Sequence, residues 1–68
     1  MAIEYKKYGK LLIMCMERGY STFTMEQLGL IVRTTTDGKQ AIDKMIDLCL
    51  STTTEQELLR QAQKLIGQ

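Results

Sequence analysis

Apolar side chains recur every three or four residues along most of this chain, which is the period of an amphipathic α-helix. No stretch alternates apolar and polar residues over the length of a strand. The periodic segments are residues 3–18, 25–33, 38–50 and 55–66. The pattern therefore predicts an all-α fold, a small four-helix domain that takes up residues 1–68 as a single unit.

The first two predicted helices have recognisable ends. Gly19 ends the first, because glycine adopts the left-handed conformation without a Cβ clash. Thr24 and Gln27 have the spacing of a capping box, in which the threonine hydroxyl accepts from a backbone N–H and the glutamine reaches back. Phe23 precedes this cap and is placed to pack on Leu28 as a hydrophobic staple. These signals predict a second helix that starts at residue 25.

The later helix starts use the same signal. Asp37 with Gln40, and Thr54 with Glu57, have the capping spacing just before a new apolar period. The two threonine triplets, in RTTTDG and STTTEQ, thus include or adjoin a helix start. They are predicted first as loop and capping residues.

A chain of 68 residues is near the size at which folding buries only about 60% of the unfolded surface. A partner subunit often supplies the missing stability. The fourth segment carries an apolar stripe wider than three short helices can readily cover, so we expect a homodimer through it. The alternative is that this helix closes the core of a monomer. The residues of the predicted dimer interface are Leu58, Leu59, Ala62, Leu65 and Ile66.

The chain has two cysteines, Cys15 and Cys49, and no histidine. Both cysteines fall on apolar faces, where a cysteine usually behaves as a small hydrophobic residue, so we expect reduced thiols in the core. Charge runs through the first ten residues, and the apolar run 11–16 is too short for a signal peptide or a membrane span. These features predict a cytoplasmic protein with no membrane partner.

The sequence contains few of the residue types that carry out catalysis. Without histidine, the commonest general base and zinc ligand is missing. Asp43 and Asp47 share a helix face, but Lys39 lies one turn before them, and a solvated charged stripe explains the set. We expect no enzyme activity, no cofactor and no metal site.

One longer stretch, FTMEQLGLIVRTTTDGKQAIDKMIDL, has the order capped helix, turn, helix, and it follows a helix that ends in glycine. Over residues 8–50 it resembles the three-helix core of helix-turn-helix and winged-helix DNA-binding proteins. In that family a small residue follows a buried leucine in the first helix of the motif, and Leu28 and Gly29 match. Val32 and Ile42 fall on further apolar positions. The family's β-hairpin wing is replaced here by the helical segment 55–66.

The resemblance implies a small regulatory DNA-binding protein of helix-turn-helix type, acting in transcription regulation. The small size, the single domain and the lack of a catalytic set suggest an accessory protein of a phage, plasmid or bacterium. It would bind double-stranded DNA, with Gln40 reading a base edge and the threonine hydroxyls and Arg33 holding phosphates. The nucleic-acid-binding residues it implies are Arg33, Thr34, Thr35, Thr36, Lys39, Gln40 and Lys44.

The alternative is a helical protein-interaction module, such as an antagonist, anti-repressor or assembly factor, that offers an apolar helix face to a protein partner. Its support is the number of methionines, because methionine-rich surfaces adapt to their targets. The net charge of +1 favours neither function. The methionines concerned are Met14, Met16, Met25 and Met45.

Overall fold

The structure is a computed structural model that describes residues 5–67. It confirms the predicted fold class: the described residues form a small all-α domain with no strand. The last helix continues directly into a short 3₁₀ segment. The elements are α1 (Tyr5–Glu17), α2 (Thr22–Thr34), α3 (Gly38–Ser51), α4 (Glu55–Gln63) and the 3₁₀ helix η1 (Lys64–Gly67).

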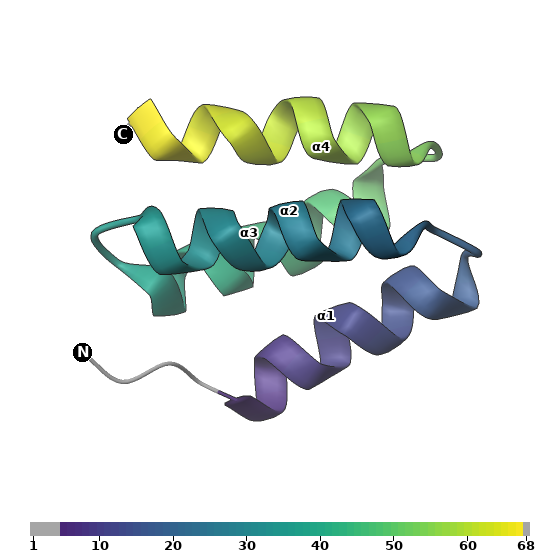
Figure 1. The fold of residues 1–68 in the computed structure, drawn as a ribbon, viewed down its shortest axis with the longest axis horizontal. Coiled ribbons are helices and arrows are strands. Elements are labelled where there is room, and N and C mark those ends of the chain that lie inside the picture. The colour runs from purple at the N-terminus through teal and green to yellow at the C-terminus, as the bar shows by residue number, and fades with distance from the viewer. Residues whose placement is uncertain (1–4, 68) are drawn as a thin grey trace.

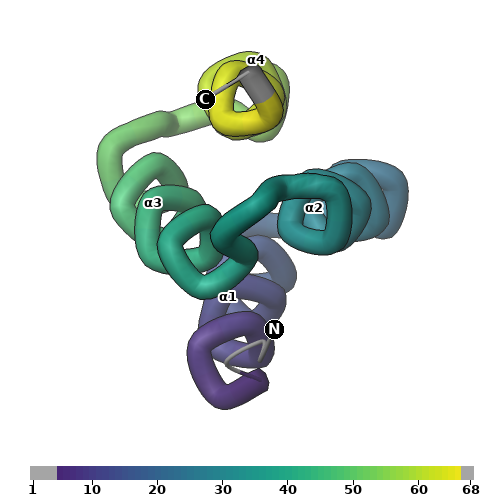
Figure 2. The backbone as a smooth tube through the Cα atoms, turned by 90° about the vertical axis from the view of Figure 1, so that its left-hand side faces the viewer, coloured from purple at the N-terminus to yellow at the C-terminus, as the bar shows by residue number. Residues whose placement is uncertain are grey.

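Successive helices run in alternating directions along the long axis of the domain (Figure 1). The pair α2 and α3 lies in the middle, with α4 on one side and α1 on the other (Figures 1 and 2). Helix α1 packs mainly against α3 and only slightly against α2. The α1–α2 side is consequently more open than the rest of the domain.

All the helices contribute to one core, as the apolar period predicted. The residues concerned are at most 8% exposed, and most are fully buried. Partly buried side chains, among them Tyr8 and Met25, pack around this cluster. The core consists of Leu11, Cys15, Leu28, Ile31, Val32, Ala41, Ile42, Met45, Cys49, Leu58, Ala62 and Leu65.

Gly19 ends α1 as predicted. Its φ of 75° lies in the left-handed region that favours glycine. The N–H of Tyr20 donates to the Cys15 carbonyl (3.0 Å), and the N–H of Gly19 donates to the Met16 carbonyl (3.0 Å). These two bonds are those of a Schellman motif, which satisfies carbonyls that the helix end would otherwise leave unpaired.

The predicted start of α2 was wrong by one turn. The N-cap is Ser21, whose Oγ accepts from the Thr24 N–H at 3.2 Å. Thr24 itself is buried inside the first turn, and Phe23 is 62% exposed, so no hydrophobic staple forms there. Serine is as good an N-cap as threonine, and the local sequence gave no means to choose between the two.

The choice is made by Glu55, at the start of α4. Its Oε2 accepts from the Ser21 N–H (3.0 Å), the Ser21 hydroxyl (3.2 Å) and the Thr24 hydroxyl (2.5 Å). These bonds, the one from Thr24 first, hold the pKa of the Glu55 carboxyl below its ordinary value. Glu55 thus acts as the acidic member of a capping box, but it comes from another helix and ties the starts of α2 and α4 together.

Replacing Thr24 tests this tie. Thr24→Val keeps the shape of the side chain but removes the donor to a carboxylate, so the free energy of unfolding should fall. Because the folded-state pKa of Glu55 is lowered, this stabilisation is complete above its unfolded value near 4.5 and disappears as the pH falls through the folded value.

Urea unfolding at several pH values measures both effects. The difference between wild type and Thr24→Val should be largest above about pH 4.5 and shrink in acid. Thr22→Val is the matched control, because Thr22 is an exposed threonine in the same turn. A difference that persists unchanged in acid would show that the Glu55 carboxylate is not the partner.

The other two predicted caps are confirmed. Asp37 Oδ1 accepts from the Gln40 N–H at 3.1 Å, and Thr54 Oγ1 accepts from the Glu57 N–H at 3.2 Å. The Glu57 carboxylate turns to the Arg60 guanidinium instead, at 2.6 Å. The threonine triplet in STTTEQ therefore contains the N-cap residue of α4, Thr54.

The predicted dimer stripe requires a correction. Leu58 and Ala62 are fully buried and Leu65 is 8% exposed, whereas Leu59 is half-buried and Ile66 is 52% exposed. The first three face the α2–α3 pair and are covered within one chain, so they need no second copy to be buried. The homodimer itself stays a prediction. Because α2 and α3 lie side by side, together they offer α4 a surface that neither helix has alone. We therefore assign α4 to the core of the monomer, which was the alternative.

Both cysteines are fully buried in the core, as predicted. Burial, and then the neighbouring Cys49, raise the pKa of the Cys15 thiol to about 11. A thiol with that pKa is protonated at neutral pH and is a poor nucleophile. Cys15 and Cys49 therefore serve as core residues between α1 and α3.

Candidate nucleic-acid interface

One end of the domain gathers most of its basic side chains. The starts of α1 and α3, the end of α2 and the η1 segment all lie toward the end where the two chain termini are marked (Figure 1), and Figure 2 looks directly onto it. We call this surface the basic end. Lys44 follows about one turn further along α3. The basic end consists of Lys6, Lys7, Arg33, Lys39 and Lys64.

The opposite end is mainly acidic. Glu17 is the last residue of α1, and Glu55 and Glu57 lie in the first turn of α4. Glu26 lies in the first half of α2. Two helices start and two end at each end of the domain, so the helix dipoles largely cancel there. A chain with a net charge of only +1 therefore folds into a domain whose side-chain charges are separated along its 30 Å length.

Three carboxylates of the described residues lie close to the basic end. Asp47 lines a cavity with Lys44 and Lys64, and the other two have partners within the chain. Asp43 forms an ion pair with the Lys7 ammonium at 2.9 Å. Asp37 caps α3. An exposed ion pair contributes little stability, but it neutralises Asp43 locally. Much of the remaining positive charge, on side chains such as Lys6 and Lys39, is exposed to solvent.

The threonine hydroxyls that the sequence assigned to phosphate contacts divide into two groups. Thr34 Oγ1 donates to the Leu30 carbonyl at 2.9 Å, and Thr35 Oγ1 donates to the Ile31 carbonyl at 2.5 Å. Phosphate oxygens need donors, and these two hydroxyl protons are already used inside α2. We therefore assign Thr34 and Thr35 to the end of the helix. Thr36 is exposed in the turn that follows.

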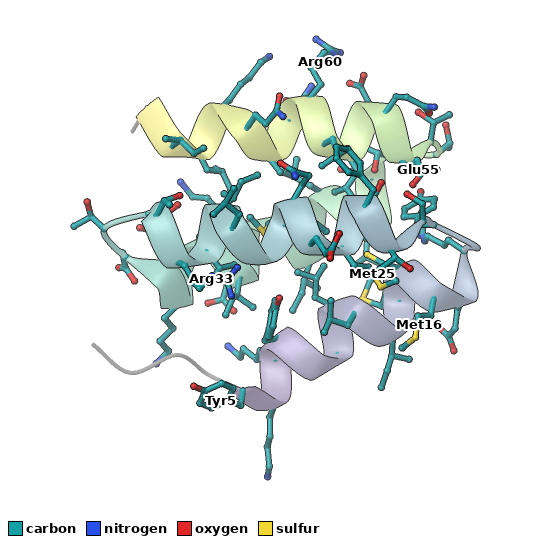
Figure 3. The ribbon with its side chains drawn as sticks, in the orientation of Figure 1. Tyr5, Met16, Met25, Arg33, Glu55 and Arg60 are labelled. Carbon is teal, nitrogen blue, oxygen red and sulfur yellow. The ribbon has the colours of Figure 1, made fainter. Side chains whose placement is uncertain are left out.

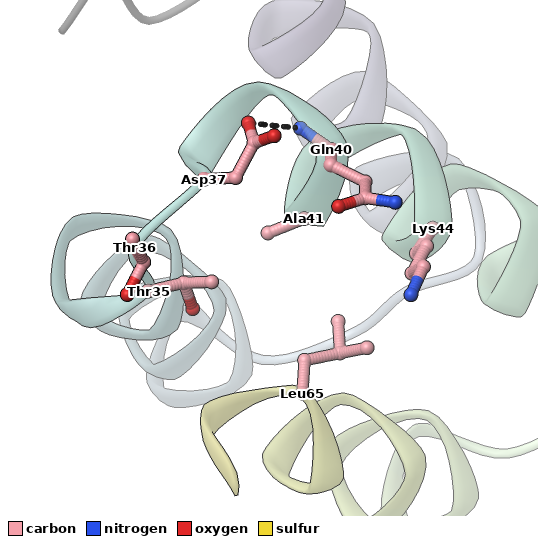
Figure 4. Close-up of a pocket in the computed structure, with 7 residues that line it drawn as sticks. All are labelled: Thr35, Thr36, Asp37, Gln40, Ala41, Lys44 and Leu65. Atoms are coloured by element: carbon pink, nitrogen blue, oxygen red, sulfur yellow. Dashed lines mark hydrogen bonds between the residues drawn. The ribbon is translucent and has the colours of Figure 1, made fainter. Parts of the chain in front are cut away.

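The predicted α3 residues are all exposed, but they do not share one face. Lys39 and Lys44 are five positions apart, which places them about 140° apart around a helix. Gln40 and Lys44 lie on one side and line a cavity of about 120 Å³ (Figure 4). Leu65 forms the opposite wall of this cavity. The α3 face with Gln40 and Lys44, which was predicted to enter a DNA groove, is thus partly covered by η1.

The relation of α2 to α3 bears on the helix-turn-helix resemblance. A helix-turn-helix places its two helices at about 90–120°, whereas α2 and α3 run side by side in opposite directions (Figure 1). The match at Leu28 and Gly29 has a different basis here. Leu28 is buried in the core, and a Cβ on Gly29 would overlap the hydroxyl of Tyr8. Gly29 thus makes room for a tyrosine of α1 rather than for α3.

The open α1–α2 side contains a feature that the sequence did not predict. Figure 3 shows Tyr5 and Arg33 near the basic end of this side and Met25 further along it. A small slot of about 140 Å³ lies between Tyr5 and Arg33, and Tyr8, Gly29 and Val32 complete its lining. A shallower groove of about 530 Å³ continues along α2 past Leu12, Met25 and Glu26.

No sequence spacing joins Tyr5 to Arg33, because they belong to helices that come together only in the fold. The available signal was indirect. Two tyrosines three positions apart lie on one side of α1, and a glycine lies one turn before Arg33 on α2. The sequence assigned Arg33 to a phosphate contact, and the structure places it beside two aromatic rings as well.

No protein-family model, curated protein or solved structure matches this chain. The site is therefore interpreted from its own chemistry. Within residues 5–67, no group of three or more cysteine, aspartate and glutamate side chains is arranged to hold a metal ion. None of the helices in this described part is long and apolar enough to cross a membrane.

Proposed function

We propose that this protein binds DNA through its basic end, in a regulatory role. The observation that supports this is that basic residues of four separate elements lie in turns at the same end of the domain. Clustered lysine and arginine side chains displace counterions from the phosphate backbone, and this displacement supplies most of the affinity of non-specific DNA binding. Lys6, Lys39 and Lys64 act as point charges toward phosphates in this proposal.

The size of the basic end suits such a ligand. The two shorter extents of the domain are 24 and 20 Å, and duplex DNA carries one phosphate charge for about every 1.7 Å of its axis. Several phosphates therefore come within reach of one domain at once. Gln40 remains the side chain proposed for a base edge, because its amide can both donate and accept.

The dependence of affinity on salt tests this function. Fluorescence anisotropy of a labelled 20–30 base-pair duplex should show tight binding at low salt, with affinity falling about 100-fold from 50 to 200 mM salt if roughly four phosphates are contacted. A plot of log affinity against log salt should be linear with a slope near −4. No binding at 50 mM salt, or a slope near zero, would refute the proposal.

A second function has an observation of its own. The α1–α2 groove is lined by Leu12 and Met25, and Met16, on the α1 side, is 57% exposed. Apolar side chains in a groove between two helices are a common docking site for an amphipathic partner helix, and Glu26 and Arg33 line the same groove. This supports a protein-interaction module, with the partner held by the groove rather than by α4. Such binding should be nearly independent of salt, which separates it from the first proposal.

A further inference from the structure

We infer that the slot between Tyr5 and Arg33 accepts an unpaired nucleobase, so that the DNA bound at the basic end is single-stranded where it meets α1 and α2. This inference rests on the proposed function, since it names the form of DNA that the same end would take. It adds a base-binding site built from Tyr5, Tyr8 and Arg33, with Gly29 and Val32 as its apolar lining.

The aromatic side chain at the entrance is unusually exposed. Tyr5 is 76% exposed, the largest exposed fraction among the large hydrophobic residues that lie open on the described surface. Its ring is available for stacking, and base stacking on an aromatic ring tolerates any sequence because every base has a π-face. Arg33, also exposed, carries a planar guanidinium that stacks on bases and pairs with phosphates.

The volume and lining of the slot fit a base. An apolar cavity of about 150 Å³ is known to hold benzene, and this slot of about 140 Å³ has room for a six-membered ring of similar size. The described residues that line it are aromatic, apolar or basic, a combination that suits a nucleotide. Gly29 contributes directly, because a side chain there would collide with Tyr8 and change the slot.

Cationic side chains accompany the slot on both of its helices. Arg33 of α2 lines it, and Lys6 follows Tyr5 in the first turn of α1. The phosphates that flank a base in the slot would therefore be close to the Arg33 guanidinium. In a duplex the bases are stacked and paired, and one could enter the slot only after unstacking, which costs a few kcal/mol.

The test compares two labelled ligands of equal length, an oligothymidylate of about 12 nucleotides and the duplex of that strand with its complement. Anisotropy titrations at one salt concentration are made with wild type, Tyr5→Ala, Tyr5→Phe and Arg33→Lys. Phe23→Ala is the matched control, because Phe23 is also an exposed aromatic residue (62%) but lies near the acidic end. Far-UV circular dichroism shows that each variant keeps its helices.

We expect wild type to bind the single strand more tightly than the duplex. Tyr5→Ala should weaken single-strand binding about 5- to 100-fold and leave duplex binding nearly unchanged, since stacking acts on unpaired bases. Tyr5→Phe and Phe23→Ala should resemble wild type. Arg33→Lys keeps the charge but loses the planar group, so it should weaken binding of the single strand more than that of the duplex.

Two outcomes overturn the inference while the proposed function stands. These are duplex binding at least as tight as single-strand binding, and single-strand affinity that does not change in Tyr5→Ala. If wild type binds neither ligand at low salt, the proposed function fails together with the inference.

Discussion

Leu58→Asp should leave the protein largely unfolded at room temperature. Leu58 lies on the side of α4 that faces the core and is fully buried. Removing such a leucine costs about 2–5 kcal/mol, and an unpaired carboxylate in the same place costs more. A domain of 68 residues has a total stability of roughly 3–10 kcal/mol. The loss is therefore of the same size as the whole free energy of unfolding.

Far-UV circular dichroism and sedimentation equilibrium together test this prediction. Leu58→Asp should lose most of its helical signal, whereas Gln63→Asp, an exposed position near the end of the same helix, should stay folded with a change of about 0.5 kcal/mol or less. We expect wild type to sediment as one chain of 7.8 kDa. A wild-type dimer that becomes a folded, helical monomer in Leu58→Asp would contradict the assignment of α4 to the core.

Reversing two charges at the basic end should nearly abolish DNA binding. In Lys6→Glu/Lys39→Glu, two attractions to phosphate become repulsions, and at about 1 kcal/mol per charge in water the affinity should fall roughly 100-fold or more at low salt. Both residues lie in the first turn of a helix. The helix dipole stabilises a carboxylate at that position. The variant should therefore stay folded, and the loss of affinity cannot come from unfolding.

The control places a reversed charge elsewhere. Arg60→Glu on α4 makes the same change in net charge per residue, and Arg60 pairs with Glu57 toward the acidic end. Its DNA affinity should stay within a few-fold of wild type, whereas the single variant Lys39→Glu should already weaken binding and lower the salt slope by about 1. Equal losses in Arg60→Glu and Lys39→Glu would mean that net charge, and not the basic end, controls binding.

The helices were predictable because the signals that set them are local. Gly19 ends α1 through its own backbone freedom, and Asp37 and Thr54 cap α3 and α4 with bonds to residues three positions away. The apolar period likewise identified most of the core, since a helix buries the side that carries its hydrophobic residues, but Ile66 on the same stripe as Leu58 is 52% exposed. The start of α2 was the exception, because the carboxylate of Glu55 that selects Ser21 arrives from a distant part of the chain.

The candidate site depended on how the helices pack, which their own sequences do not specify. Charges as far apart in the chain as Lys6 and Lys64 form one basic end only because alternate helices run in opposite directions. The slot exists because α1 packs on α3 and leaves α2 partly uncovered, which brings Tyr5 beside Arg33. The sequence by itself determined four amphipathic helices and their apolar sides, through interactions within a few residues. Tertiary packing alone decided that Leu58 is covered and that the basic side chains share one surface, because both follow from contacts between residues far apart in the chain.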